Sequence, residues 1–253
     1  MFKNKKGIGL IPLILIIVLV LVIGTVAIVL VLNKDDSSEE STDKTISTSN
    51  KINSDKNNDK NESDNNGKIT ISSVKKAKET DASKFDYIEI DGGVSITDYS
   101  GKDEIVVIPE KIDGKTVVSI GKNAFVNNDT MRGLKISNSV HIIENSSCTN
   151  CTELQVFVSG TSLKIIEENA FLNTKLEYVE LNEGLETLEI SSFGFTHLKE
   201  IEIPSSVKNI NLPFLVDEVN NNGSITIIGE AGSAAEQYVN EYGEEYHLTF
   251  QAK

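Results

Sequence analysis

Apolar residues recur every 22 or 23 positions through much of this chain, and this periodicity constrains its fold more than any other feature. One column of the repeat consists of Ile120, Ile143, Ile166, Leu188 and Ile210. Three further columns keep the same step: Phe125, Cys148, Phe171, Phe193 and, one residue early, Phe214; then Met131, Leu154, Leu176 and Leu198; then Val140, Leu163, Leu185 and Val207. Each such unit exposes an apolar face that only stacking on a neighbour buries, so the sequence predicts a solenoid with one continuous core.

Each unit also carries a short stretch in which apolar and polar residues alternate. Ile201-Glu202-Ile203 has the period of two that is typical of a strand with one buried face, and Pro204 then turns the chain. The sequence therefore predicts a mainly β fold, with one strand in each 22–23-residue coil. The second unit has Ser159 where an aliphatic residue is expected, so we expect that coil to be locally deformed.

These residues resemble a known family. The run 198–210, the pairs Ala124-Phe125 and Ala170-Phe171, the opening 108–114 and the closing segment 229–238 are similar to the BspA-type leucine-rich repeats of bacterial surface proteins. The resemblance covers residues 85–250 and implies a short leucine-rich-repeat solenoid. It further implies a role in cell-surface attachment or protein binding, with no catalytic residues.

Both ends of the predicted solenoid carry segments that close its core, as a stack of coils requires. Residues 85–99 predict a hairpin whose turn is Asp91-Gly92-Gly93. At the other end, residues 233–242 predict a short helix begun by a capping box of Ser233 and Glu236. A last strand, residues 246–250, completes the predicted C-terminal cap.

Residues 8–32 contain no charged side chain, and a helix of this length reaches about 37 Å, enough to cross a bilayer. Lys3, Lys5 and Lys6 precede this segment and acidic residues follow it, so the positive-inside rule places the N-terminus in the cytoplasm and the rest outside. A cleaved signal peptide has a shorter apolar run and a small-x-small cleavage site, which are both missing. We interpret residues 8–32 as an uncleaved signal anchor in the cell membrane, after a cytoplasmic tail of residues 1–7.

The segment 5–11 also resembles the start of a type IV pilin, in which processing follows a glycine. That family carries a glutamate at the fifth position after the glycine, where this chain has Pro12. A pilin-like surface protein with a shortened N-terminus therefore remains an alternative.

Residues 33–68 consist almost entirely of small polar and charged residues, with two aliphatic exceptions. Such a segment buries too little apolar surface to offset its chain entropy, so we predict a disordered linker spanning about 30–36 Å. Residue 84 is an alternative end for this linker. The leucine-rich repeat domain with its caps then occupies residues 85–253.

No arrangement of residues in the sequence indicates an enzyme, a metal centre or a cofactor site. Cys148 and Cys151 have the spacing of a redox or half-zinc motif, but Cys148 falls in a core column and no second pair exists. We interpret both as structural, with a local disulfide as the alternative. The histidines, at positions 141, 197 and 247, occupy unrelated places in the repeat.

Stacking of the repeats also predicts two ladders of like charge. Glu144, Glu167 and Glu189 follow one apolar column directly, and Glu180 and Glu202 share a place in the strand. Carboxylates about 5 Å apart repel one another by roughly 1 kcal/mol in water. Either their side chains splay into solvent, or, as a hypothesis, this side of the solenoid binds calcium or a cationic partner.

The charge of the chain limits its partners. All 38 acidic residues but only 21 of the 24 basic ones follow residue 32, which leaves a net charge of −17 outside the membrane. Such a charge disfavours nucleic acid and anionic envelope polymers. We therefore expect a non-catalytic, membrane-anchored module that binds a protein or an envelope component, adhesion being one form of this. A structural or accessory envelope protein without an external ligand is the alternative.

Overall fold

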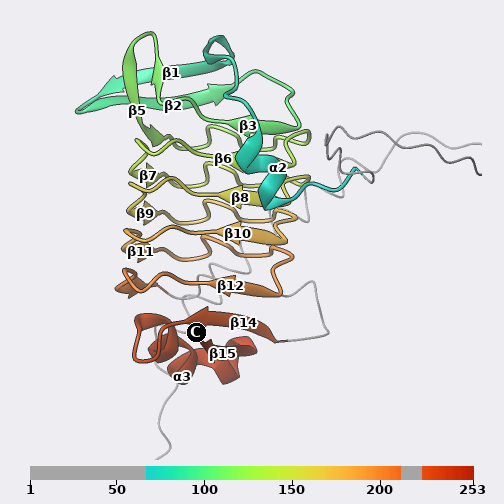
Figure 1. The fold of residues 1–253 in the computed structure, drawn as a ribbon, viewed down its shortest axis with the longest axis vertical. Helices are drawn as coiled ribbons and strands as arrows, with labels where there is room; N and C mark the ends of the chain where they lie inside the picture. The colour runs from blue at the N-terminus through green and yellow to red at the C-terminus, as the bar shows by residue number, and fades with distance from the viewer. Residues whose placement is uncertain (1–66, 212–223) are drawn as a thin grey trace, which may run out of the picture. The chain divides into compact units, whose positions relative to one another are not determined.

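The computed structural model describes residues 67–211 and 224–253, which belong to one compact unit. These residues form a solenoid whose coils stack in sequence order from the N-terminal hairpin to the C-terminal helix (Figure 1). The expectation of a mainly β solenoid is confirmed, but the expectation of one strand per coil is wrong. Each central coil contributes two short strands, a three-residue strand to one sheet and a two-residue strand to another.

The longer sheet joins the N-terminal hairpin to the two-residue strands. Its order is β1 (Phe85–Ile90), β2 (Gly93–Tyr99), β5 (Lys115–Ile120), β7 (Ile142–Ile143), β9 (Ile165–Ile166), β11 (Thr187–Leu188) and β13 (Asn209–Ile210), with β4 (Lys111–Ile112) paired to β5. From β5 to β13 the strands are parallel, and the apolar column that begins with Ile120 lies in register down the whole sheet. The column predicted from the sequence is therefore a strand ladder.

The three-residue strands and the last two strands of the chain, of five residues each, form the other side of the solenoid in two separate sheets. One has the order β10 (Tyr178–Glu180), β8 (Val156–Val158), β6 (Gly133–Lys135) and β3 (Ile105–Val107). The other consists of β12 (Glu200–Glu202), β14 (Ile225–Gly229) and β15 (Leu248–Ala252). We call the outward side of β3, β6, β8, β10, β12 and β14 the strand face.

The second coil is not deformed, contrary to the expectation based on Ser159. Strand β8 pairs in register with β6 on one side and β10 on the other. The hydroxyl of Ser159 replaces an aliphatic contact with hydrogen bonds, since it accepts from the backbone N–H of Asn182 at 2.8 Å and from its side-chain amide at 3.1 Å.

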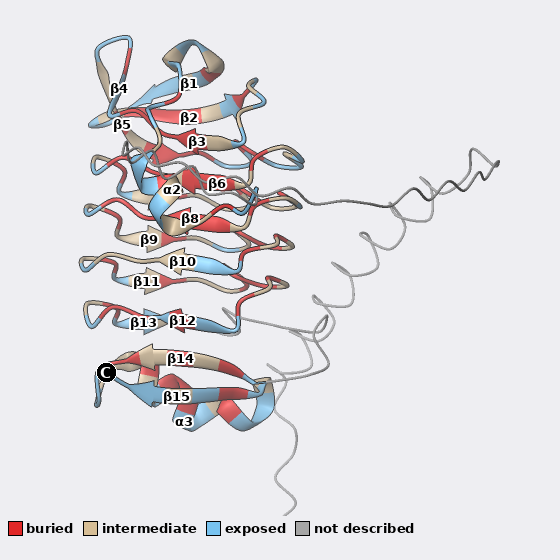
Figure 2. Ribbon diagram, turned by 45° about the vertical axis from the view of Figure 1, so that its right-hand side comes forward, coloured by how far each residue is buried: buried red, intermediate tan, exposed pale blue. Residues whose placement is uncertain are grey.

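The core lies between the two sides of the solenoid, where the buried segments of successive coils form continuous bands (Figure 2). The predicted columns within the described residues are buried except for Ile210, which is partly buried. The rings of Phe157, Phe171 and Phe193 pack in sequence, Phe157 tilted on Phe171 and Phe171 stacked on Phe193. Cys148 is a small residue in a phenylalanine column, whereas Phe157 of the same coil is large in a column of aliphatic residues. The large Phe157 side chain offsets the small Cys148 side chain in the volume that this coil contributes to the core.

Both predicted caps are present. The hairpin β1–β2 closes the N-terminal end, with Gly92 in the left-handed region of its turn at φ 86°. At the C-terminal end, α3 (Ala234–Tyr246) is longer than predicted and ends at His247. Ser233 caps it as expected by accepting from the Glu236 N–H, while the Glu236 carboxylate accepts from the backbone of Gly232.

The turns between strands repeat as regularly as the strands. Asn127, Asn150 and Asn173 stand at the same place in successive coils and all have positive φ, which asparagine tolerates better than most residues. Their side chains form a ladder in which Asn150 donates to Asn127 at 3.0 Å and Asn173 donates to Asn150 at 2.8 Å. Their 23-residue spacing is visible in the sequence.

The predicted membrane anchor, residues 8–32, and the predicted linker, residues 33–68, lie outside the described residues except for the last two positions. Among the helices that the structure describes, none has the length and apolar character needed to span a bilayer.

Candidate functional site

Residues 67–84, of which 67 and 68 were predicted as linker and 69–84 as its alternative extension, pack on the solenoid. Helix α2 (Ile71–Lys76) and the 3-10 helix η1 (Ala82–Lys84) form within this segment, and α2 lies across the strand face (Figures 1 and 2). We call residues 67–80 the strap. A six-residue helix has little stability alone, so α2 depends on the surface beneath it.

The surface beneath the strap is apolar. Val156 and Val158 of β8 point outward and are nevertheless buried, in a small cluster with Ile69 and Val74 of the strap and with Ile105 of β3 at its border. The sequence carried a signal for this cover, because Ile105-Val106-Val107 and Val156-Phe157-Val158 are continuous apolar runs. Strands buried on both faces have such runs, whereas strands with one wet face alternate.

The strap fits closely because β6 has no side chain at the point of contact. A Cβ added to Gly133 would lie 2.6 Å from Cγ2 of Val74 and 3.5 Å from Cγ2 of Ile69. The φ of Gly133 is not positive, so the glycine is needed for this close approach rather than for its backbone conformation.

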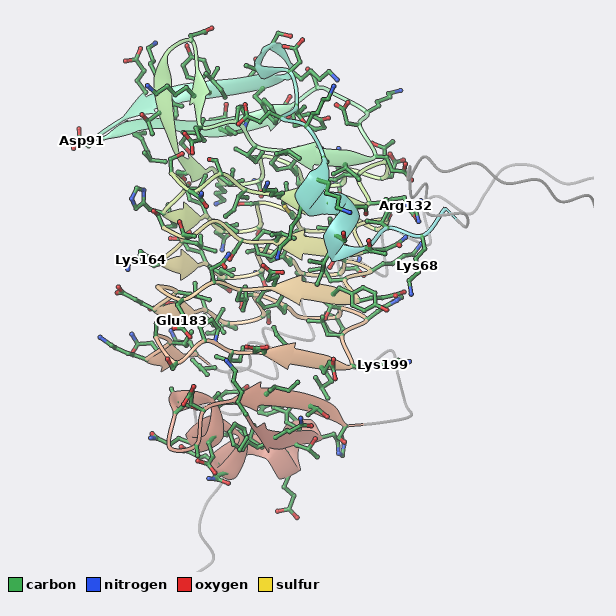
Figure 3. The ribbon with its side chains drawn as sticks, viewed as in Figure 1. Lys68, Asp91, Arg132, Lys164, Glu183 and Lys199 are labelled. Carbon is green, nitrogen blue, oxygen red and sulfur yellow. The ribbon has the colours of Figure 1, made fainter. Side chains whose placement is uncertain are left out.

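Polar contacts hold the strap at both ends. Thr80 exchanges two hydrogen bonds of 3.0 Å with the backbone of Val107 in β3. At the other end, the Arg132 guanidinium donates to the carbonyl of Gly67 at 2.8 Å and also pairs with Glu104. Lys68 and Arg132 lie on the same edge of the solenoid as Lys199, opposite Lys164 and Glu183 (Figure 3). The strap is thus an integral part of the folded domain.

The strap divides the strand face into two halves. We call the outward side of β3, β6 and β8 the covered half, and the outward side of β10, β12 and β14 the open half. Val156 and Tyr178 face each other in strand register, yet Val156 is 0% exposed and Tyr178 is 40% exposed.

A groove of about 880 Å³ lies in the open half. Residues of β10, β12 and β14 and of the turns before them line it, and Ile71 of the strap contributes to its wall. The lining contains three carboxylates, those of Glu177, Glu200 and Glu202, against one lysine, Lys199. No pattern in the sequence indicates this groove, because β12 alternates like any strand with one solvent-exposed face.

The predicted ladder of Glu180 and Glu202 in the strands is neutralised by lysines, so the two carboxylates do not repel each other unopposed. Glu180 pairs with Lys75 of the strap at 2.6 Å, and Glu202 pairs with Lys253 at 2.6 Å. The hydrogen bond from Lys253 to Glu202 raises the pKa of that lysine. The two glutamates therefore have separate cationic partners, one from the strap and one from the last residue of the chain.

The three glutamates beside the longer sheet are stacked as predicted in the backbone, since each N–H donates to the carbonyl of the preceding coil. Each carboxylate also accepts a hydrogen bond: Glu144 from Ser119 and Ser95, Glu167 from the Asn145 N–H at 2.8 Å, and Glu189 from Asn211 at 2.6 Å. These donors offset the mutual repulsion. That this ladder faces a cation or a cationic partner stays a prediction, tested by the triple Glu→Gln variant with calcium present.

Cys148 and Cys151 are free and completely buried, so the alternative of a local disulfide is wrong. Burial raises the pKa of the Cys148 thiol well above its ordinary value, which keeps it protonated and unreactive. The Cys151 thiol donates to the carbonyl of Phe125. The interpretation of Cys148 as a core residue is confirmed.

The histidines occupy three different elements: His141 precedes β7, His197 precedes β12 and His247 ends α3. Across residues 67–211 and 224–253, no three His, Cys, Asp or Glu side chains are arranged to hold a metal ion.

Parallel coils of 22–23 residues around a ladder of apolar side chains define a leucine-rich-repeat solenoid. Residues 108–229 match the family described as BspA type leucine rich repeat region, in six copies. The resemblance of the motifs to BspA-type leucine-rich repeats is therefore confirmed over these residues.

The fold is also that of a solved structure. The leucine-rich repeat protein of T. pallidum is 26% identical and superposes with a TM-score of 0.54 over 60% of this chain and 71% of its own. A leucine-rich repeat protein from Bacteroides ovatus is 22% identical with a TM-score of 0.47, and the match spans 57% of this chain and 45% of the other. No curated protein matches the chain significantly.

Proposed function

We propose that this protein is a non-catalytic binding module, which recognises a protein or an envelope component through the open half of its strand face. The groove there is the observation that carries the proposal, because it combines an exposed aromatic ring, aliphatic walls and several charged groups. Such mixed surfaces are typical of protein interfaces. Leucine-rich repeats supply an extended, regular surface of this kind.

We further propose that residues 8–32 anchor the module in the cell membrane and that residues 33–66 tether it on the outer side. The uncharged run of twenty-five residues and the lysines before it support this proposal. A tether of this length favours a partner close to the membrane. An adhesive role is one version of this function, but a longer tether would suit adhesion to a distant surface better.

Intact cells expressing the full chain would test both parts. A photo-crosslinking phenylalanine analogue replaces Tyr178 in one variant and the exposed Glu168, in the turn after β9, in the control. We expect protein adducts at position 178 and few at position 168, and digestion of a C-terminal epitope by protease added outside. Equal adducts at both positions, or none, would contradict binding through the strand face. A protected epitope would contradict external display.

A further inference from the structure

Hydrogen bonding between successive coils is interrupted at one place on the strand face. Strands β10 and β12 belong to different sheets, although β11 and β13 of the same two coils are paired in register. The ladder between these two coils therefore continues on one side of the solenoid and stops on the other. The facing edges of β10 and β12 keep backbone groups outside any ladder between them, as edge strands do. The groove lies where the ladder between β10 and β12 is missing.

The groove carries an excess of negative charge. Glu177 and Glu200 are exposed at its two sides, and neither forms an ion pair with a described residue. Glu202 is already paired with Lys253. An anionic groove in a domain of strongly negative charge attracts cationic segments and repels acidic ones.

The strap shows what this face recognises. Lys68 donates to the hydroxyl of Tyr178 at 3.2 Å and lies 5.3 Å from the centre of its ring, while Lys75 pairs with Glu180. Ile69 and Val74, between these lysines, bury themselves on the strands. A segment that mixes lysines with aliphatic residues thus already binds the neighbouring part of the same face, and its Ile71 reaches the groove.

We propose that the groove between β10 and β12 binds an extended basic segment of a partner protein, in which lysine or arginine side chains flank an aliphatic one. The basic groups face Glu177 and Glu200, and the aliphatic side chain lies between Tyr178 and Ile228. This inference rests on the proposed function and names the partner's chemistry. Charge complementarity and continuity with the strap's own binding surface carry it.

A labelled peptide with the sequence of residues 67–76 serves as the probe, with fluorescence anisotropy of the detergent-solubilised full chain as the readout. We expect saturable binding that weakens with added salt, and no binding of a peptide whose three lysines are replaced by glutamate. The double variant Glu177→Lys/Glu200→Lys should weaken binding by about tenfold or more.

The control is Glu110→Lys/Glu168→Lys, which changes the net charge equally at exposed positions outside the groove. Equal weakening in both double variants would reduce the effect to overall charge and overturn the proposal, as would failure of the wild-type chain to bind. Circular dichroism confirms that each variant is folded before binding is compared.

A third variant, Val74→Asp, separates the groove from the strap's own site. We expect nearly unchanged affinity for the peptide, because the strap contributes only Ile71 to the groove, whereas the groove's carboxylates and Tyr178 belong to β10, β12 and the turns before them. Tighter binding would mean that the peptide replaces the strap, and the groove would not be its site. Crosslinks at position 178 without peptide binding would leave the proposed function standing and reject only the basic partner.

Discussion

On β8 the outward positions carry Val156 and Val158, whereas on β12 the matching positions carry Glu200 and Glu202. Inward, the two strands contribute Phe157 and Ile201 to the same core. The same repeat thus forms both the covered half of the strand face, on which the strap packs, and the open half. The comparison teaches that the repeat determines the inside of every coil but leaves the outward positions free to specialise.

The difference has an energetic counterpart. Outward side chains in the covered half are shielded from water and contribute to folding, at about 25 cal/mol for each Å² of apolar surface buried. Those in the open half are solvated, and their exposed ion pairs contribute little. The covered half therefore serves stability, and the open half is available for a partner.

The largest expected effect is in the core that both halves share. Phe171→Ala removes a ring that stacks on Phe193 with centres 5.2 Å apart and contacts Phe157 at 4.6 Å. We expect a loss of roughly 3–5 kcal/mol in the free energy of unfolding, because a buried cavity remains. Urea denaturation measures it. A loss below about 1 kcal/mol would mean that the two halves do not share one core.

The difference between the two halves is tested by replacing one outward side chain in each half with alanine. Val156→Ala should lower the free energy of unfolding by about 1.5 kcal/mol, since two buried methyl groups are lost. Glu200→Ala, the matched control in the open half, should change it by less than about 0.5 kcal/mol. Equal effects in urea denaturation would contradict the division of the strand face.

A close contact is tested by Gly133→Ala, which places a methyl group 2.6 Å from Val74. We expect a loss of about 1 kcal/mol and faster tryptic cleavage at the lysines of the strap, because α2 must shift. Val74→Ala removes the opposing methyl groups and should restore most of this loss in the double variant. Losses that simply add in the double-mutant cycle would show that the strap does not press on β6.

The smallest expected effect concerns pH at the edge of the solenoid opposite Lys68. Burial acts to raise the pKa of Glu183, but the N–H groups of Ser205 and Ser206, which donate to it at 3.1 Å, outweigh burial and hold that pKa below its ordinary value. A lowered pKa in the folded state stabilises the protein above the unfolded carboxyl pKa, and this stability is lost as the pH falls below about 4.

Glu183→Gln should therefore lower the melting temperature at pH 7. Between pH 6 and pH 3, however, the melting temperature of the variant should fall by less than that of the wild type. Melting curves followed by circular dichroism at several pH values measure this difference. Parallel pH profiles for the two proteins would show that Glu183 does not contribute to acid sensitivity.

Much of the fold could be predicted, because the repeat states the same packing rule several times. The columns of Ile120 and Phe125, the hairpin and the capped helix all depend on local patterns. The second strand of each coil was missed because two residues, such as Ile142–Ile143, are too few to show a period. The deformation predicted from Ser159 is absent because a polar side chain fits this position once a partner such as Asn182 satisfies it.

The candidate site was less predictable. The double burial of β8 could have been inferred from Val156-Phe157-Val158, but which segment covers it depends on a meeting of residues far apart in the sequence. Val74 reaches Gly133 across 59 positions, and Lys68 reaches Tyr178 across 110. No local pattern encodes such contacts.

The sequence by itself determined the solenoid, its register, its caps and the family of its repeats, since stacking identical units leaves one way to bury their apolar columns. Tertiary structure alone decided that the strap covers half of the strand face, that lysines neutralise Glu180 and Glu202, and that a groove separates β10 from β12. The physical reason is that inward positions obey the periodic packing of neighbouring coils, whereas outward positions depend on whichever distant segment the folded chain brings over them.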